Sequence, residues 1–240
     1  MRLTNLTAAV VVLLLNAACG PRAHIPPRPV LVPGALDAAD SSAVLARALA
    51  PLLYLQKDES FPLERVVAVI HPTEPLIAYH LLWRDDVHGA WIPFTKPTDE
   101  EVVWVRYDST RAPVEVWTYW HGKILHSAWQ NRGQVEIDVQ WGKHGSLPRG
   151  MRRSDLPFFQ SIGSFWLGHW VGLPDIWLGN LTRRGPWCFC HGFGRYLAFD
   201  EPMAITPRVD AVVRTKKAGD ALLAVFGKPY SKKPEWPPGF

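Results

Sequence analysis

The sequence lacks a strong excess of either charge, a long uninterrupted hydrophobic run and an internal repeat. The net charge is +4, and the basic residues come in separated pairs rather than in a stripe. This distribution argues against nucleic acid as a partner. The apolar stretches at 8–15 and 156–180 are too short, or too often interrupted by Gly and Pro, to cross a membrane as helices.

Catalytic signatures are missing as well. There is no Gly-x-Ser-x-Gly elbow, P-loop, dinucleotide-binding glycine motif or zinc-protease motif, so the sequence assigns no reaction. Tryptophan is plentiful instead, with 12 residues. Because Trp is large and amphipathic, this number indicates either a thick aromatic core, which is the default, or a binding surface.

The first residues predict export. A positive residue, an apolar run and then small residues are typical of a secretory signal peptide, which we place at 1–18. Cys19 follows two alanines and precedes a glycine, which resembles a bacterial lipobox, although Asn16 stands where Leu is usual. We therefore predict a lipidated Cys19 and a chain anchored in the cell envelope, on the periplasmic or surface side of a bacterial membrane. Ordinary signal cleavage beside an incidental Cys is the alternative.

The rest of the chain divides by composition. Residues 19–34 hold five prolines and predict a stiff, poorly helical tether after the lipidated Cys. Residues 35–228 predict a single β-sandwich-like domain, and 229–240 a proline-rich tail.

Hydrophobic periodicity predicts a mainly β fold, an antiparallel β-sandwich with a short N-terminal helix and an irregular or helical C-terminal part. A helix is expected within 35–55, with a cap at Ser41 or Ser42, and Pro51 ends or kinks it. A second helix is expected at 218–226. The expected strands are 66–70, 77–83, 102–107, 114–120, 134–141 and, near the end, 209–214. In 134–141 apolar and polar residues alternate, which predicts one dry and one wet face.

Acidic residues and a histidine flank two of these strands. Asp85, Asp86 and His88 follow 77–83, and Asp99 and Glu101 precede 102–107. If the two strands are antiparallel neighbours, these groups lie at one end of the sheet. They would suit Ca²⁺ or Mg²⁺, and His would shift the preference toward Zn²⁺ or Mn²⁺; the same groups suit acid–base work. Solvated loop tips are the plain alternative, since no spacing here is diagnostic.

Four stretches carry a resemblance to a family. "APLLYLQKDESFP", "AYHLLWRDD", "TDEEVVWVRYD" and "WGKHGSLPRG" follow the order of landmarks in the Vps62-like proteins and, more distantly, the NPP1-like necrosis-inducing proteins, over about residues 50–150. The resemblance implies a β-sandwich. It also implies that Asp99, Glu101 and Asp85 or Asp86 match acids that bind a divalent cation in the NPP1-like proteins. Glu100 replaces a Trp of that pattern, and the histidines that precede its acids are absent.

His144 stands between Gly142 and Gly145 on the turn after 134–141. Its neutral pKa suits a ligand or a general base, and a packed, hydrogen-bonded turn residue is the other interpretation. His121, after 114–120, poses the same choice. In a simple hairpin of 114–120 with 134–141 it would lie far from His144, so we do not expect the two to pair.

Cys188, Cys190 and His191 crowd together before a Gly-rich turn. A disulfide between the two cysteines is favoured, because lipidation of Cys19 would leave an even count in an oxidising compartment. Buried thiols come second and a soft-metal site third, since a fourth ligand is not evident nearby.

Two functions remain open on the sequence alone. The first is a non-enzymatic envelope protein that binds an unknown ligand through an aromatic face. The second is a metal-assisted hydrolase, or a cation-dependent binder, that uses the acidic cluster. Insertion of 156–180 into a membrane is a third and weaker idea.

Overall fold

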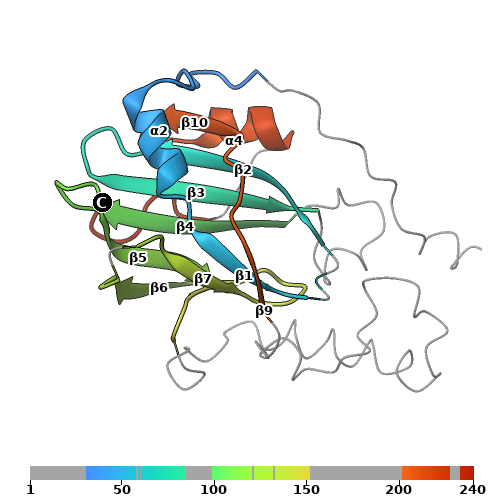
Figure 1. The fold of residues 1–240 in the computed structure, drawn as a ribbon. Helices are drawn as coiled ribbons and strands as arrows, with labels where there is room; N and C mark the ends of the chain where they lie inside the picture. The colour runs from blue at the N-terminus through green and yellow to red at the C-terminus, as the bar shows by residue number, and fades with distance from the viewer. Residues whose placement is uncertain are drawn as a thin grey trace, which may run out of the picture.

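The computed structural model describes residues 31–84 except 58 and 60, 99–151 except 121 and 132, 202–227 and 233–240. Two β-sheets and two helices make up this part of the chain (Figure 1). Sequence order gives α2 (Ser41–Ala48), β1 (Leu52–Gln56), β2 (Leu63–Ile70), β3 (Leu76–Trp83), β4 (Asp99–Tyr107), β5 (Pro113–Trp120), β6 (Lys123–Ala128), β7 (Glu136–Val139), β8 (Ser146–Pro148), β9 (Pro202–Ile205), β10 (Ala211–Arg214) and α4 (Gly219–Phe226).

The two sheets face each other as a sandwich, so the predicted fold class is confirmed. The larger sheet has the order β10-β2-β3-β4-β5-β6, and the smaller one β8-β7-β1-β9. Two pairs, β1 with β7 and β10 with β2, are parallel, and the other pairs are antiparallel. The parallel pairs join segments that are distant in sequence. The apolar periodicity of a strand does not indicate whether its partner runs parallel or antiparallel to it.

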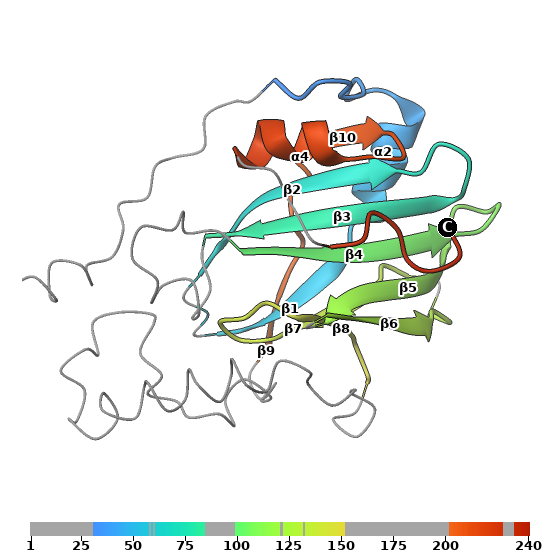
Figure 2. The same ribbon diagram turned by 180° about the vertical axis from the view of Figure 1, so that it is seen from behind.

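The main core fills the space between the sheets. Leu53 and Ile137 of the smaller sheet pack there with Tyr79 and Trp83 of β3. The outer face of the larger sheet is also covered, by α4 and by residues 233–240, over a second core that contains Trp104 and other apolar side chains. Figure 2, from behind, shows both covers. All of β3 is therefore buried.

The predicted helix at 35–55 is shorter than expected. It spans Ser41–Ala48, and its cap is Asp40, whose carboxylate accepts hydrogen bonds from the backbone N–H groups of Ser42 and Ala43. Asp accepts such bonds as well as Ser does. The chain then passes Pro51 and enters β1. The prediction that these residues belong to the helix is therefore wrong. The short apolar run of β1 fits the periodicity of a helix as well as that of a strand. Only its pairing with β7 and β9 makes it a strand.

Other elements follow the predictions closely. The strands expected at 66–70, 77–83, 102–107, 114–120 and 209–214 and the helix at 218–226 are present, with bounds shifted by a few residues. In the stretch expected at 134–141 the strand itself is β7, whose residues alternate between partly and fully buried. Strands β6, β8 and β9 were not predicted. Strand β6 pairs with β5 in the larger sheet, and β7 belongs to the smaller one.

Tryptophan in this part of the chain is core. Of the seven tryptophans that the structure describes, five are buried and two are half-buried. No tryptophan among the described residues is exposed, so none of them forms an uncovered aromatic face. None of the described helices is long and apolar enough to cross a membrane.

Candidate functional site

Strands β3 and β4 bring the acidic run of β4 to one end of the larger sheet. They are antiparallel, and Trp83 at the end of β3 lies opposite Asp99 at the start of β4. The neighbour relationship on which the predicted cluster depended is therefore confirmed. Asp85, Asp86 and His88 lie outside the described residues, as do Cys19, His121, Cys188, Cys190 and His191.

His144 reaches this sheet end from the turn between β7 and β8. Its backbone N–H donates to the carbonyl of Gln140 at 2.9 Å, and its φ of +54° lies in the left-handed region. Gly145 has a different reason to be glycine: a Cβ there would lie 2.8 Å from the ring of Trp120. The glycine lets the turn press against Trp120, and this turn places the imidazole inside the protein.

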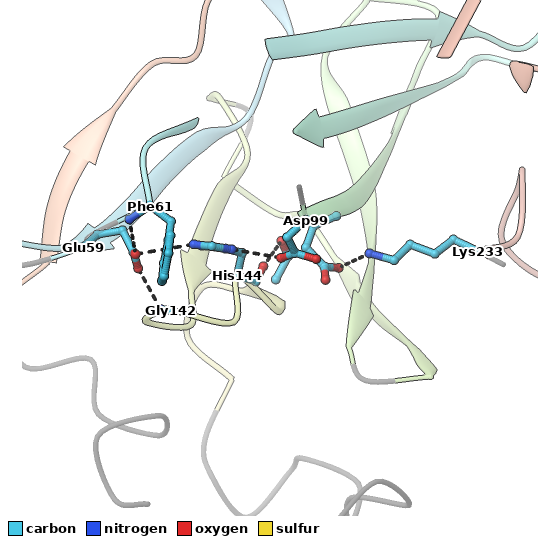
Figure 3. A network of polar contacts seen from close by, with 8 residues as sticks. Glu59, Phe61, Asp99, Gly142, His144 and Lys233 are labelled. Carbon is cyan, nitrogen blue, oxygen red and sulfur yellow. Dashed lines mark hydrogen bonds and ion pairs between the residues drawn. The ribbon is translucent and has the colours of Figure 1, made fainter. Parts of the chain in front are cut away.

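The His144 ring lies between the carboxylates of Glu59 and Asp99 (Figure 3). Nδ1 lies 2.9 Å from a carboxylate oxygen of Asp99, and Nε2 lies 3.5 Å from one of Glu59. The ring stacks on Trp83, with centroids 4.2 Å apart and planes 4° from parallel, and Phe61 meets it edge-on. The His144 side chain is 0% exposed, and those of Glu59 and Asp99 are 6% and 18% exposed.

Glu59 is itself fixed by the backbone. One carboxylate oxygen accepts from the N–H of Phe61 at 2.9 Å, and the other accepts from the N–H of Gly142 at 2.8 Å. The carboxylate thus ties the end of β1 to the turn that carries His144. Chain segments separated by more than 80 residues are held together by this one side chain.

The charges of this triad, Glu59–His144–Asp99, support one another. Burial alone would lower the pKa of His144, but the hydrogen bond to Asp99 and the ion pair with Glu59 outweigh burial and raise that pKa to about 9. Burial alone would raise the pKa of Asp99 and of Glu59, but hydrogen bonding to His144 and its charge bring both below their ordinary values. At neutral pH the triad is an imidazolium between two carboxylates, with neither ring nitrogen free to accept a proton or bind a metal.

Glu101 pairs with a different base. The Lys233 ammonium lies 3.0 Å from its carboxylate and over the ring of Tyr119. Burial raises the pKa of Glu101 to about 8, against the attraction of Lys233. Burial alone would lower the pKa of Lys233, but the carboxylates of Glu101, Glu100 and Asp99 raise it, so the lysine stays charged.

Glu100 completes the set. Its carboxylate lies 2.8 Å from Nδ1 of His80 on β3, and both side chains are buried. Each of the three consecutive acids of β4 therefore has its own basic partner. Within the part of the chain that the structure describes, no group of three or more His, Cys, Asp or Glu side chains is arranged to hold a metal ion. The divalent-cation site expected at Asp85, Asp86, Asp99 and Glu101 stays a prediction.

The sequence indicated Asp99 and His144 only as separate candidates, and it predicted neither their pairing nor their other partners. His80 inside an apolar strand was a visible signal, because a buried histidine needs a partner. Glu59 and Lys233 gave no such signal: one follows β1, the other stands in the proline-rich tail, and only the fold brings them to β4.

Comparisons with known proteins find only distant likenesses. No family model matches the chain, and no curated protein matches it. Among solved structures, NLPPya in complex with glucosamine is 15% identical, with a TM-score of 0.36 over 51% of this chain and 73% of that one. Necrosis and Ethylene inducing Protein 2, from the causal agent of cocoa's Witches Broom disease, is 14% identical, with a TM-score of 0.35 over 50% and 75%. A toxin-fold protein of microbial attack and plant defense is 14% identical, with a TM-score of 0.33 over 56% and 84%.

Proposed function

We propose that this chain is a lipid-anchored cell-envelope protein whose β-sandwich is a binding module, and that the His144 triad belongs to its framework rather than to a reaction centre. The observation that carries the second part is that both ring nitrogens of His144 face carboxylates. A general base needs a free nitrogen lone pair, and so does a metal ligand. The triad supplies neither at neutral pH.

Lipid anchoring is supported by the leader and by Cys19 after two small residues. The proline-rich residues that follow suit a spacer between a membrane surface and a folded domain. The Vps62-like landmarks support the same kind of β-sandwich, and they add no reaction.

Cation titration tests the framework role. We expect the melting temperature of the full chain to stay unchanged with Ca²⁺, Mg²⁺, Mn²⁺ or Zn²⁺, because Asp99 and Glu101 already hold cationic partners. A rise that Asp99→Asn abolishes, and that the surface variant Glu64→Gln leaves intact, would establish a cation site and overturn the proposal.

Membrane fractionation tests the anchor separately. The wild-type chain should sediment with membranes and carry a lipid on its mature N-terminus by mass spectrometry. Cys19→Ser should release it to the soluble fraction. An unmodified wild-type N-terminus, or equal partition of both forms, would contradict the anchor and leave the framework role untouched.

A further inference from the structure

The last eight residues, "KPEWPPGF" at 233–240, lie along the outer face of the larger sheet. Figure 2 shows this segment crossing that face beside β4, away from the smaller sheet. Its contacts come from both the sheet and the connection between β10 and α4. Contacts are made by Lys233, Glu235, Trp236 and Phe240, and the ring of Pro237 is buried.

Three polar contacts fix the middle of the segment. The indole N–H of Trp104 donates to the carbonyl of Glu235 at 3.0 Å, and the indole N–H of Trp236 donates to the carbonyl of Lys216 at 2.9 Å. The Glu235 carboxylate accepts from the N–H of Ala218, the cap of α4, at 3.0 Å. Ala218 has no capping side chain of its own, so Glu235 supplies the cap and a negative charge at the helix N-terminus.

Side-chain anchors flank these contacts. The Lys233 ammonium pairs with Glu101 at 3.0 Å, and the Trp236 ring meets His71 edge-on at 4.7 Å. Pro237 is buried. The Phe240 ring meets Trp117 edge-on at 5.5 Å. Lys233, Trp236 and Phe240 are spaced three and four residues apart, so the contacts extend along the whole segment.

A tight turn sets the last anchor. The N–H of Phe240 donates to the carbonyl of Pro237, and Gly239 has a φ of +97°. Proline at the second and glycine at the third position of such a turn are the residues of a type II turn. The turn brings Phe240 back toward Trp117, and no residue with a Cβ would make it as readily.

The surface beneath the segment therefore has the chemistry of a peptide groove. It offers an acid for a lysine, an indole donor for a backbone carbonyl, and rings that meet the tryptophan and phenylalanine side chains. Aromatic-lined grooves with an indole donor are a recurring way to bind proline-rich peptides, whose backbone has little freedom to lose.

We propose that this face is a binding groove for proline-rich peptides with lysine, tryptophan and phenylalanine at the spacing of residues 233–240, and that the chain's own C-terminus occupies it as an internal ligand. The groove accepts the same sequence from outside when the tail is removed. The inference rests on the proposed binding function and names its partner class, whereas the anchor and the framework role are tested without it.

The direct test uses the chain truncated after residue 232 and a fluorescein-labelled peptide KPEWPPGF. Binding is measured by fluorescence anisotropy. We expect saturable binding by the truncated chain, and binding by the wild-type chain weaker by roughly tenfold or more because its groove is filled. The W236A peptide and a scrambled peptide of the same composition are the controls. A folded truncated chain that binds no peptide, or that binds the scrambled one equally, overturns the proposal.

A second variant covers the case in which truncation prevents folding. The full-length triple variant Lys233→Ala, Trp236→Ala, Phe240→Ala keeps the tail but removes its anchors, so it should bind the labelled peptide more tightly than the wild-type chain. Equal binding by the two chains overturns the proposal. A double-mutant cycle between Glu101→Gln in this variant and the K233M peptide should show coupling, because the two changes remove the same contact. A dimer in which two full-length chains exchange tails would also support a groove that accepts the segment from outside.

Discussion

The stability of this protein should fall as the pH rises from neutral to about 9, and His144 should be the main cause. In the folded protein its pKa is about 9, whereas an imidazole in the unfolded chain has the ordinary value near 6.5. A shift of this size means that folding strengthens the binding of the proton by about 3 kcal/mol. Because the side chain is fully buried, solvent screening takes little from this value.

The free energy of unfolding falls with rising pH because the folded chain keeps a proton that the unfolded chain loses. Below about pH 6.5 both states are protonated, and the imidazolium contributes its full stabilisation. Between 6.5 and 9 the unfolded chain has lost the proton and the folded chain keeps it, so the free energy of unfolding falls by up to about 1.4 kcal/mol per pH unit. Glu101, whose pKa is raised to about 8, also makes the free energy of unfolding fall as the pH rises. This contribution ends near pH 8.

The assay compares urea unfolding of the wild-type chain and His144→Asn across this pH range, followed by circular dichroism. Asparagine tolerates the left-handed backbone at 144 and does not titrate. The variant should be less stable near neutral pH, and its profile should be flat between pH 8 and 9, where the wild-type profile still declines. His126→Asn is the matched control, because it removes an imidazole that is half exposed.

Two results would refute this reasoning. One is a wild-type free energy of unfolding that stays constant from pH 6.5 to 9. The other is a decline in His144→Asn as steep as in the wild-type chain. An imidazole resonance of His144 that titrates near 6.5 in NMR would locate the error in the triad itself.

Two further substitutions test the packing around the triad by urea unfolding. Asp99→Asn should cost roughly 3 kcal/mol, because it leaves a buried imidazolium with one carboxylate. Glu64→Gln, at a partly exposed pair with Arg84, should cost less than about 1 kcal/mol. Equal losses would contradict a buried ion triad. Gly145→Ala should cost about 1–3 kcal/mol, since its Cβ would press on the ring of Trp120. Gly219→Ala, which meets open space in a helix, should be neutral or stabilising, so a harmless Gly145→Ala would contradict the close approach.

Local patterns predicted many of the strands, because a run of alternating or continuous apolar residues needs no knowledge of its partner. The region around β1 shows the limit: its apolar residues fit a strand or the end of a helix, and the pairing with β7 and β9 decides between them. Strand β6 was missed for a related reason. Its residues are mostly polar or half-buried, since it is the edge strand of the larger sheet.

The site residues also divide into those that the sequence indicated and those that it did not. The acids that open β4 and the glycine-flanked His144 were recognisable as candidates, since both stand at strand ends and carry charge or a titratable ring. Their partners were not recognisable. Glu59 and Lys233 look like ordinary surface residues in the sequence, and they become members of a buried charge network only when three distant segments meet beside β4.

By itself the sequence determined the class of fold and the candidate acids, and it predicted a leader for export. All of these rest on local composition and spacing. The tertiary structure decided the partners: which base neutralises which acid, which face the C-terminus covers, and whether His144 has a free nitrogen. Such pairings depend on distances between segments far apart in the chain, and burial then shifts each pKa according to the partner that those distances provide.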